Sequence, residues 1–209
     1  MNLRDRVRLF QIGTRLLTAP LLPTSEDAPQ VPALPADWPQ GMASDHGSLE
    51  VRRSILRPLC SLAARGHFPL GEMPIHELVI REELALQWPL FRLMLEDEGA
   101  LLRWHPHLAW YQERVRRRGR LNAKRKLAKC MLTFRSLQNE GFRTDDGDPI
   151  MVYRSPRYLI RNGGSHRLAM LAAMGRQSVP VVVLDRHVIL EDPDIPAPLR
   201  QRILELDPA

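Results

Sequence analysis

Prolines are concentrated in one short stretch near the start of the chain, and this tract limits what the chain can fold into. Six of the 18 prolines in the 209 residues lie between positions 20 and 39. Each proline fixes φ and removes a backbone N–H donor, so both helix and sheet are excluded there. We expect residues 19–47 to form an extended linker or a wrapping arm. The packed structure must therefore come from the segments on either side.

The overall composition is that of a globular protein, with 44% hydrophobic and 26% charged residues. No run of 18 apolar residues is present, so we expect no transmembrane segment. The chain reaches charged residues before any apolar run, which argues against a signal peptide. Cys60 and Cys130 lack the number and spacing of a disulfide framework, a zinc site or a redox pair. These features predict a cytoplasmic protein with reduced thiols.

The first 18 residues have the pattern of an amphipathic helix. Leu3, Val7, Phe10 and Leu17 recur at helical spacing and predict its apolar face. Such a helix either lies on a membrane surface or docks on its own domain, and we favour docking.

Apolar periodicity and turn residues predict the other elements. In chain order these are a helix from Ser48 kinked or split at Pro58, a strand at 73–80, a helix at 82–98 interrupted near Pro89, helices at 107–118 and 122–140 parted near Gly119, strands at 149–153 and 157–160, a helix at 166–174, a strand at 179–184 and a short helix at 199–206. Four apolar residues of the helix at 82–98 are expected in the core: Trp88, Phe91, Leu93 and Leu95. The fold class that follows is α+β, with a small mixed sheet and a larger helical portion.

One segment, residues 158–169 (YLIRNGGSHRLA), has the order strand, glycine turn, helix. Gly163 and Gly164 permit positive φ and carry no Cβ atom that would keep a ligand away from the backbone. Backbone amides of such a turn and of the following helical turn form an anion site. Ser165 either caps the helix or donates its hydroxyl to a phosphate oxygen.

His166 and Arg167 strengthen the case for an anion. The first turn of a helix prefers acidic side chains by about 0.3–1 kcal/mol each, and this helix places a histidine and an arginine there. A bound phosphate would offset the mismatch, because arginine offers a bidentate fork. The alternative is a structural turn with Arg167 paired to a carboxylate such as Asp185.

From about Lys129 to Leu184 the chain resembles the ParB/sulfiredoxin-like superfamily. The residues that carry the resemblance keep the order and spacing of the family: Asn139–Gly141 at a helix end, Pro149–Val152 (PIMV) in a strand, Gly163–Arg167 (GGSHR) in the loop, Gly175 at the next helix end, and Val179–Val181 (VPV) in the last strand. Ser165 stands where sulfiredoxins carry their nucleophilic cysteine, so the chain is not a true sulfiredoxin. The arginine-rich loop and helix-turn-helix of partition proteins are missing, which argues against sequence-specific centromere binding.

The resemblance implies nucleotide binding, with ATP or CTP and Mg²⁺, and phosphoryl transfer to a small-molecule acceptor or nucleotide hydrolysis. The residues implied to hold phosphates are Asn162, Gly163, Gly164, Ser165, His166, Arg167 and Lys129. By the same analogy Glu77, on the expected first strand, and His166 are the catalytic candidates. Asp145, Asp146 and Asp148 could serve too, although an ordinary solvated turn is the favoured interpretation of that cluster.

A basic run provides a second candidate site. Nine cations and no acid lie between 114 and 129: Arg114, Arg116, Arg117, Arg118, Arg120, Lys124, Arg125, Lys126 and Lys129. This run carries +9 in a chain of net charge +6, so the rest of the chain is mildly acidic. It is either a phosphate-binding patch of a DNA-associated adaptor or a solvated face paired with Glu82, Glu83, Glu96, Asp97 and Glu98. A third possibility is a degenerate member of the superfamily that acts as an interaction module.

The expected domain plan follows from these segments. It comprises an N-terminal helix at 1–18, the proline-rich arm at 19–47, a helical extension at 48–70, a ParB/sulfiredoxin-like domain at 71–190 with a helical insertion at 82–128, and a tail at 191–209. His105-Pro106-His107 (HPH) has no convergent helical spacing and no evident third ligand, so no metal site is expected there.

Overall fold

The protein is an α+β structure whose chain divides into two compact units. The computed structural model describes residues 3–18, 29, 33–39, 48–63, 68–142 and 149–208. The helical unit takes its residues from 1–38, 81–141 and 165–176. The sheet unit takes its residues from 39–80, 142–164 and 177–209. The expected α+β class with a small mixed sheet is confirmed.

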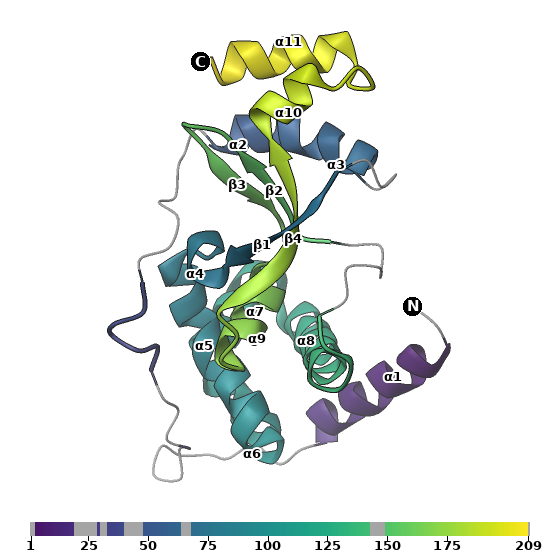
Figure 1. Cartoon of the computed structure of the whole chain (residues 1–209). Helices are drawn as coiled ribbons and strands as arrows, with labels where there is room; N and C mark the ends of the chain where they lie inside the picture. Colours follow the sequence, from purple (N-terminus) through teal and green to yellow (C-terminus); the bar gives the residue numbers. More distant parts are fainter. Residues whose placement is uncertain are drawn as a thin grey trace. The chain divides into compact units, whose positions relative to one another are not determined.

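A four-stranded sheet of order β1-β4-β2-β3 forms the centre of the sheet unit (Figure 1). Its strands are β1 (Leu70–Pro74), β2 (Met151–Arg154), β3 (Leu159–Asn162) and β4 (Ser178–Asp185). β4 runs parallel to β2 and antiparallel to β1, and β2 and β3 form a hairpin. Four valines in the eight-residue β4 explain its place inside the sheet, because β-branched side chains suit a buried strand.

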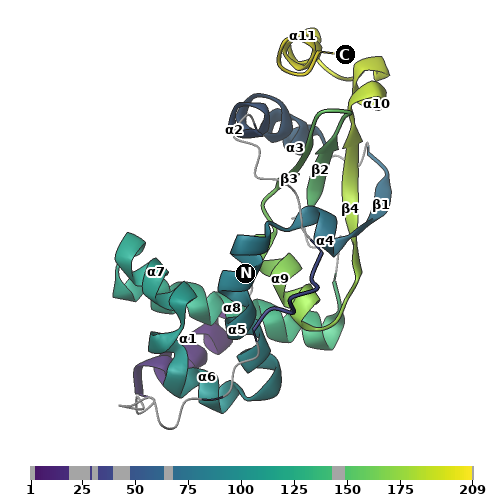
Figure 2. The same ribbon diagram turned by 90° about the vertical axis from the view of Figure 1, so that its left-hand side faces the viewer.

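A broken helix covers one face of this sheet (Figure 2). It begins as α2 (Ser48–Val51), widens into the π-helical turn η2 (Arg52–Leu56) and continues as α3 (Arg57–Ala63). The wide turn ends two residues before Pro58, which cannot donate to a carbonyl one turn back. The α-helix expected from Ser48 is therefore interrupted close to Pro58, by a π-helical turn. The helix buries Val51, Ile55, Leu56 and Leu59 against Tyr153, Ile160 and Leu184 of the sheet.

Two helices after β4 complete the sheet unit: α10 (Arg186–Glu191) and α11 (Ala197–Leu206). Ile203 of α11 joins the same core. The chain then ends on a buried polar contact, in which the Tyr153 hydroxyl donates to Asp207 Oδ2 at 2.7 Å. Arg186 Nε donates to the Asp207 carbonyl at 2.9 Å. Burial, followed by the hydrogen bond to Asp207, raises the pKa of Tyr153. These contacts tie the end of the chain to the centre of the sheet.

The helical unit is built from helices that pack on one another. They are α1 (Leu3–Thr18), α5 (Arg81–Glu96), α6 (Glu98–Trp104), the 3-10 turn η3 (His105–His107), α7 (Ala109–Arg118), α8 (Arg120–Glu140) and α9 (Ser165–Ala173). α5 packs on α9, and both α7 and α1 pack on α8. Phe91 and Phe134 stack with ring centroids 6.3 Å apart. Glycines with φ near +79° and +76° follow α7 and α8 at Gly119 and Gly141, as expected.

The predicted boundaries need correction in three places. Residues 73–80 are not one strand: β1 begins at Leu70, and Ile75–Leu78 form the helical turn α4. Leu70, the last residue of the helical extension expected at 48–70, therefore belongs to β1, and residues 64–67 lie outside the described residues. α5 passes through Pro89 without interruption. Burial of Trp88 before the proline and of Leu90 after it outweighs the cost of a proline inside a helix, which is about 3 kcal/mol.

The buried face of α1 is also not the predicted one. Ile12 and Leu16 are buried, at 2% and 1% exposure, whereas Val7 and Phe10 are exposed at 49% and 76%. Lys124 Nζ donates to the Leu16 carbonyl at 3.2 Å and so satisfies an end group of α1. Docking on the chain's own fold is confirmed, through a different stripe. Leu95, expected in the core, is 38% exposed, while Trp88, Phe91 and Leu93 are buried.

Candidate functional site

The predicted glycine turn begins in the sheet unit, at the end of β3. Gly163 and Gly164 have φ of +65° and +76°, the conformation that favours glycine. A Cβ on Gly164 would lie 2.9 Å from Ile150 Cγ1, so packing also requires a glycine there. A Cβ on Gly163 would meet nothing within 4 Å. The backbone at Gly163 is therefore open to a ligand. At Gly164, a glycine is required by packing on Ile150 as well as by the positive φ.

Arg161 fixes the orientation of the turn, a role that was not predicted from the sequence. Its side chain is buried at 8% exposure and donates to the carbonyls of Leu78 and Gly163, the latter at 2.6 Å from Nη1. Carbonyl and N–H point in opposite directions across a trans peptide. Because the Gly163 carbonyl faces the Arg161 guanidinium, the Gly164 N–H is directed away from that cation. The detectable signal was an arginine inside a strand, opposite Val152 in the hairpin.

Asn162 makes a contact that the prediction did not anticipate. Its side chain is exposed, and its Nδ2 donates to Cys60 Sγ at 3.0 Å. Cys60 lies on α3, so the contact links the end of β3 to the helix that covers the sheet. Neither cysteine of the chain is in a disulfide. The Asn162 amide is therefore engaged in the fold rather than turned to an open site.

The second half of the predicted loop begins the helix α9 of the helical unit. Ser165 is the first residue of α9, and the first turn contains no acidic residue. Ser165, His166 and Arg167 are all half-buried. The His166 ring meets Trp110 edge-on, with centroids 5.8 Å apart. The predicted end of the helix is confirmed, since Gly175 has φ +80° and Arg176 N donates to the Leu171 carbonyl at 3.0 Å.

The remaining candidate residues lie on several different elements, and Glu77 is not on the element that was predicted for it. Glu77 lies on the helical turn α4, not on a strand, and its side chain is exposed. Lys129 is exposed on α8 in the helical unit. Asp145, Asp146 and Asp148 lie outside the described residues. Asp185, the carboxylate suggested as a partner of Arg167, binds Arg154, whose Nε lies 2.6 Å from Oδ1.

The nine cations of the basic run do not form one patch. Arg116 and Arg117 share Glu113 on α7 and hold the pKa of that carboxyl down to about 2. Lys124 binds the end of α1. Arg120 and Lys124 lie one turn apart on α8. Two of the five predicted acidic partners are engaged elsewhere, as Glu96 binds Arg92 and Glu98 binds Arg135.

A third group of cations lies on the outer side of the same two helices. Arg118, Arg125 and Lys129 have exposed side chains. Arg114 Nε donates to Asn122 Oδ1 at 3.2 Å, which joins α7 to this side of α8. Arg114 and Lys126 both lie close enough to Cys130 to oppose the rise of its pKa, which burial brings to about 11.

The two histidines of the HPH sequence have structural surroundings. His105 is buried, and its Nδ1 lies 2.9 Å from the Leu102 carbonyl. Burial lowers the pKa of His105, and Lys124 and Arg120 lower it further. His107 stacks on Trp104 with ring centroids 4.4 Å apart. Across the described ranges, no three His, Cys, Asp or Glu side chains are grouped so as to hold a metal ion.

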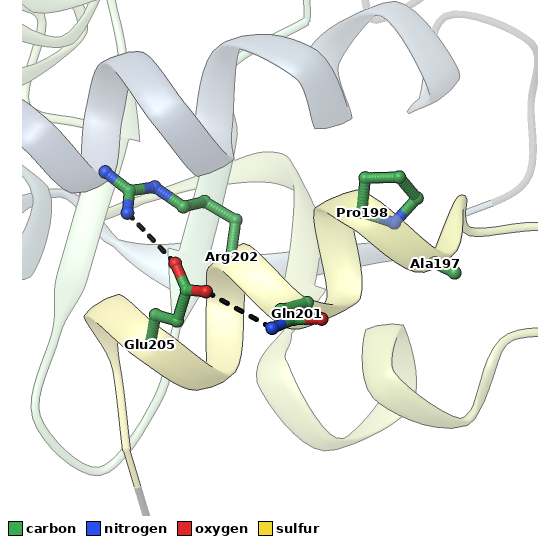
Figure 3. Close-up of a pocket in the computed structure, with 5 residues that line it drawn as sticks. All are labelled: Ala197, Pro198, Gln201, Arg202 and Glu205. Carbon is green, nitrogen blue, oxygen red and sulfur yellow. Dashed lines mark hydrogen bonds and ion pairs between the residues drawn. The ribbon is translucent and has the colours of Figure 1, made fainter.

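A hollow of about 390 Å³ lies along α11 and is lined by Ala197, Pro198, Gln201, Arg202 and Glu205 (Figure 3). Arg202 Nη1 donates to Glu205 Oε2 at 3.0 Å, and Arg202 Nη2 donates to Glu50 Oε1 at 2.7 Å. These five described residues all come from one helix, so they do not face one another across a ligand-sized space. This hollow is not a candidate active site.

Comparisons with known proteins add no relative. No family model, no curated protein and no solved structure matches the chain. Among the helices of the described residues, none is both long enough and apolar enough to cross a membrane.

Proposed function

We propose that the turn and helix start at Asn162–Arg167 bind the phosphates of a nucleotide, ATP or CTP with Mg²⁺, in a ParB/sulfiredoxin-like fold. The observation that carries the proposal is the anchoring of the Gly163 carbonyl by the buried Arg161. This anchoring supports a fixed orientation of the same peptide, in which the Gly164 N–H points away from Arg161 before a ligand binds. Preorganised donors of this kind are what a phosphate-binding loop requires.

The composition of the following helix start supports the same proposal. Ser165, His166 and Arg167 replace the acids that normally favour a helix N-terminus. A phosphate at this position would accept from the serine hydroxyl and from the arginine fork. In the proposed role, Arg167 neutralises charge that develops on the phosphate, and His166 donates a hydrogen bond to a phosphate oxygen. Asn162 contributes through its backbone, because its side chain binds Cys60.

The proposed reaction is phosphoryl transfer to a small acceptor or hydrolysis of the nucleotide. Glu77 is the proposed base for the attacking hydroxyl, by the resemblance, and its exposed carboxylate is accessible to solvent. The described residues offer no cluster of three carboxylates for Mg²⁺. In the proposed role, Mg²⁺ would keep several water ligands and would be held largely by the nucleotide phosphates, as it commonly is. When bound, Mg²⁺ would neutralise phosphate charge.

Thermal unfolding with a nucleotide panel tests the proposal. ATP or CTP with Mg²⁺ at 100 times Kd should stabilise the protein by about 2.7 kcal/mol. In a protein of this size that corresponds to a rise in Tm of roughly 5–10 °C. Arg167→Ala should abolish the rise, and Arg176→Ala, which removes an exposed arginine from the same unit, should retain it. The absence of a shift with every nucleotide, or an equal shift in both variants, would refute the proposal.

Turnover is tested separately from binding. Glu77→Gln should keep the nucleotide-dependent rise in Tm and lose release of phosphate or phosphorylated product. A Glu77→Gln variant with wild-type turnover would contradict the assignment of the base.

A further inference from the structure

The outer side of α8 carries cations that the fold does not use. Leu121, Arg125 and Lys129 are exposed and follow one another at four-residue intervals, each about 6 Å further along the helix. Ala123, Leu127 and Phe134 on the same helix are buried. Lys124, in contrast, is engaged with α1. The exposed cations of α8 therefore lie on a side distinct from the one that anchors the helix.

Arginines of α7 extend this surface. The hydrogen bond from Arg114 to Asn122 brings α7 next to the exposed side of α8. Arg118 is exposed at the end of α7. We define the outer basic face as Arg114, Arg118, Asn122, Arg125 and Lys129. It draws on two helices of one compact unit.

Carboxylates do not balance this face. The sequence from 114 to 139 contains no Asp or Glu. Among the described residues, three arginines of α7 and α8 form ion pairs: Arg116, Arg117 and Arg135. None of these three belongs to the outer basic face. Like charges gathered without counter-charges repel one another, and an external polyanion would relieve that repulsion.

The side chains on this face also restrict the class of polyanion. Leu121 is the sole large apolar side chain exposed on the described parts of α7 and α8, and a helix that inserts into a membrane surface needs a wide apolar face. The nearby aromatic rings of Trp110 and Tyr111 are buried, so no platform is offered for unstacked bases. What remains is charge on a rigid helix, which suits the phosphodiester backbone of a duplex.

We propose that the outer basic face binds the sugar-phosphate backbone of a nucleic-acid duplex without reading its sequence. This proposal does not depend on the glycine turn, because none of its residues lies there; of the phosphate-holding residues that the resemblance implies, it shares Lys129 alone. The Arg167→Ala variant should therefore bind a duplex as well as the wild type does.

Fluorescence anisotropy with a labelled 20-base-pair DNA duplex of mixed sequence, over a series of salt concentrations, tests the proposal. The double variant Arg125→Gln/Lys129→Gln removes two phosphate contacts. It should reduce the slope of log K against log salt by about 1.8, which is a loss of about 60-fold at 0.1 M salt. The matched control is Arg52→Gln/Arg53→Gln, which removes the same charge from exposed arginines of the sheet unit. The control should keep most of the affinity.

Each outcome decides the proposal. A duplex RNA bound with similar affinity, or a second DNA sequence bound equally, supports backbone recognition. Equal losses in the two double variants would show a general charge effect and overturn it. Salt-insensitive binding, tighter binding of a single-stranded 20-mer, or binding of phosphatidylserine vesicles without binding of the duplex would overturn it as well. Circular dichroism of all variants checks that the fold is intact.

Discussion

The two glycines of the turn should respond differently to the same substitution. Alanine at Gly163 or Gly164 must adopt positive φ, which costs an L-residue about 1–2 kcal/mol. At Gly163 this is the whole effect, because the added Cβ meets nothing within 4 Å. At Gly164 the Cβ also lies 2.9 Å from Ile150 Cγ1. Ile150 is fully buried and has little room to move, so overpacking adds about 1–3 kcal/mol.

We therefore expect Gly163→Ala to destabilise the protein by about 1–2 kcal/mol and Gly164→Ala by about 2–5 kcal/mol. Urea unfolding followed by far-ultraviolet circular dichroism measures both, and a change of midpoint at constant slope reports stability alone. The double variant Gly164→Ala/Ile150→Ala provides the control, because it removes the Cγ1 and Cδ1 atoms that the new Cβ would meet. Measured against Ile150→Ala alone, part of the loss caused by Gly164→Ala should be recovered. Equal costs for the two glycines, or no recovery in the double variant, would refute the packing argument.

Three further predictions concern buried polar contacts. Tyr153→Phe should cost about 2 kcal/mol in urea unfolding, because it removes a hydrogen bond to the buried Asp207; an unchanged midpoint would contradict this. The pKa of His105 in the folded chain is lowered below 6.5, so near that pH the folded chain binds fewer protons than the unfolded chain. The free energy of unfolding should therefore decrease as the pH falls below 6.5. Replacing His105 by Phe should weaken that dependence in melting curves recorded from pH 7.5 to 5, and an identical profile would count against it. Lys124→Met should speed cleavage of α1 by trypsin, because the Leu16 carbonyl loses its donor, and wild-type cleavage would argue against that role.

Element types and most helix ends followed from local chemistry. Gly119, Gly141 and Gly175 all have positive φ and follow helices, as their positions in the apolar pattern predict. The tight turn between the two short strands is confirmed by the hydrogen bond from Ser155 N to the Tyr158 carbonyl. These features depend on residues a few positions apart, so they can be read without tertiary structure.

Predictions that depended on partners from distant segments were less successful. Val7 and Phe10 have helical spacing as good as that of Ile12 and Leu16, and the packing on α8 selects the second pair. Leu95 belongs to an apolar helix but lies on its exposed side. Periodicity predicts that a helix has an apolar stripe. Which apolar residues are buried depends on the surface that the helix packs against, and that surface comes from another part of the chain.

The candidate site shows the same division. The sequence by itself determined the glycine turn, the basic helix start after it and the run of cations at 114–129, because residue type limits φ and charge wherever the residue lies. Only the tertiary structure decided that Arg161 is buried and anchors the Gly163 carbonyl, and that Gly164 packs on Ile150. It also decided that Lys124 holds α1 while Arg125 and Lys129 remain exposed. Burial and hydrogen bonding depend on which distant atoms approach, and that information belongs to the folded chain.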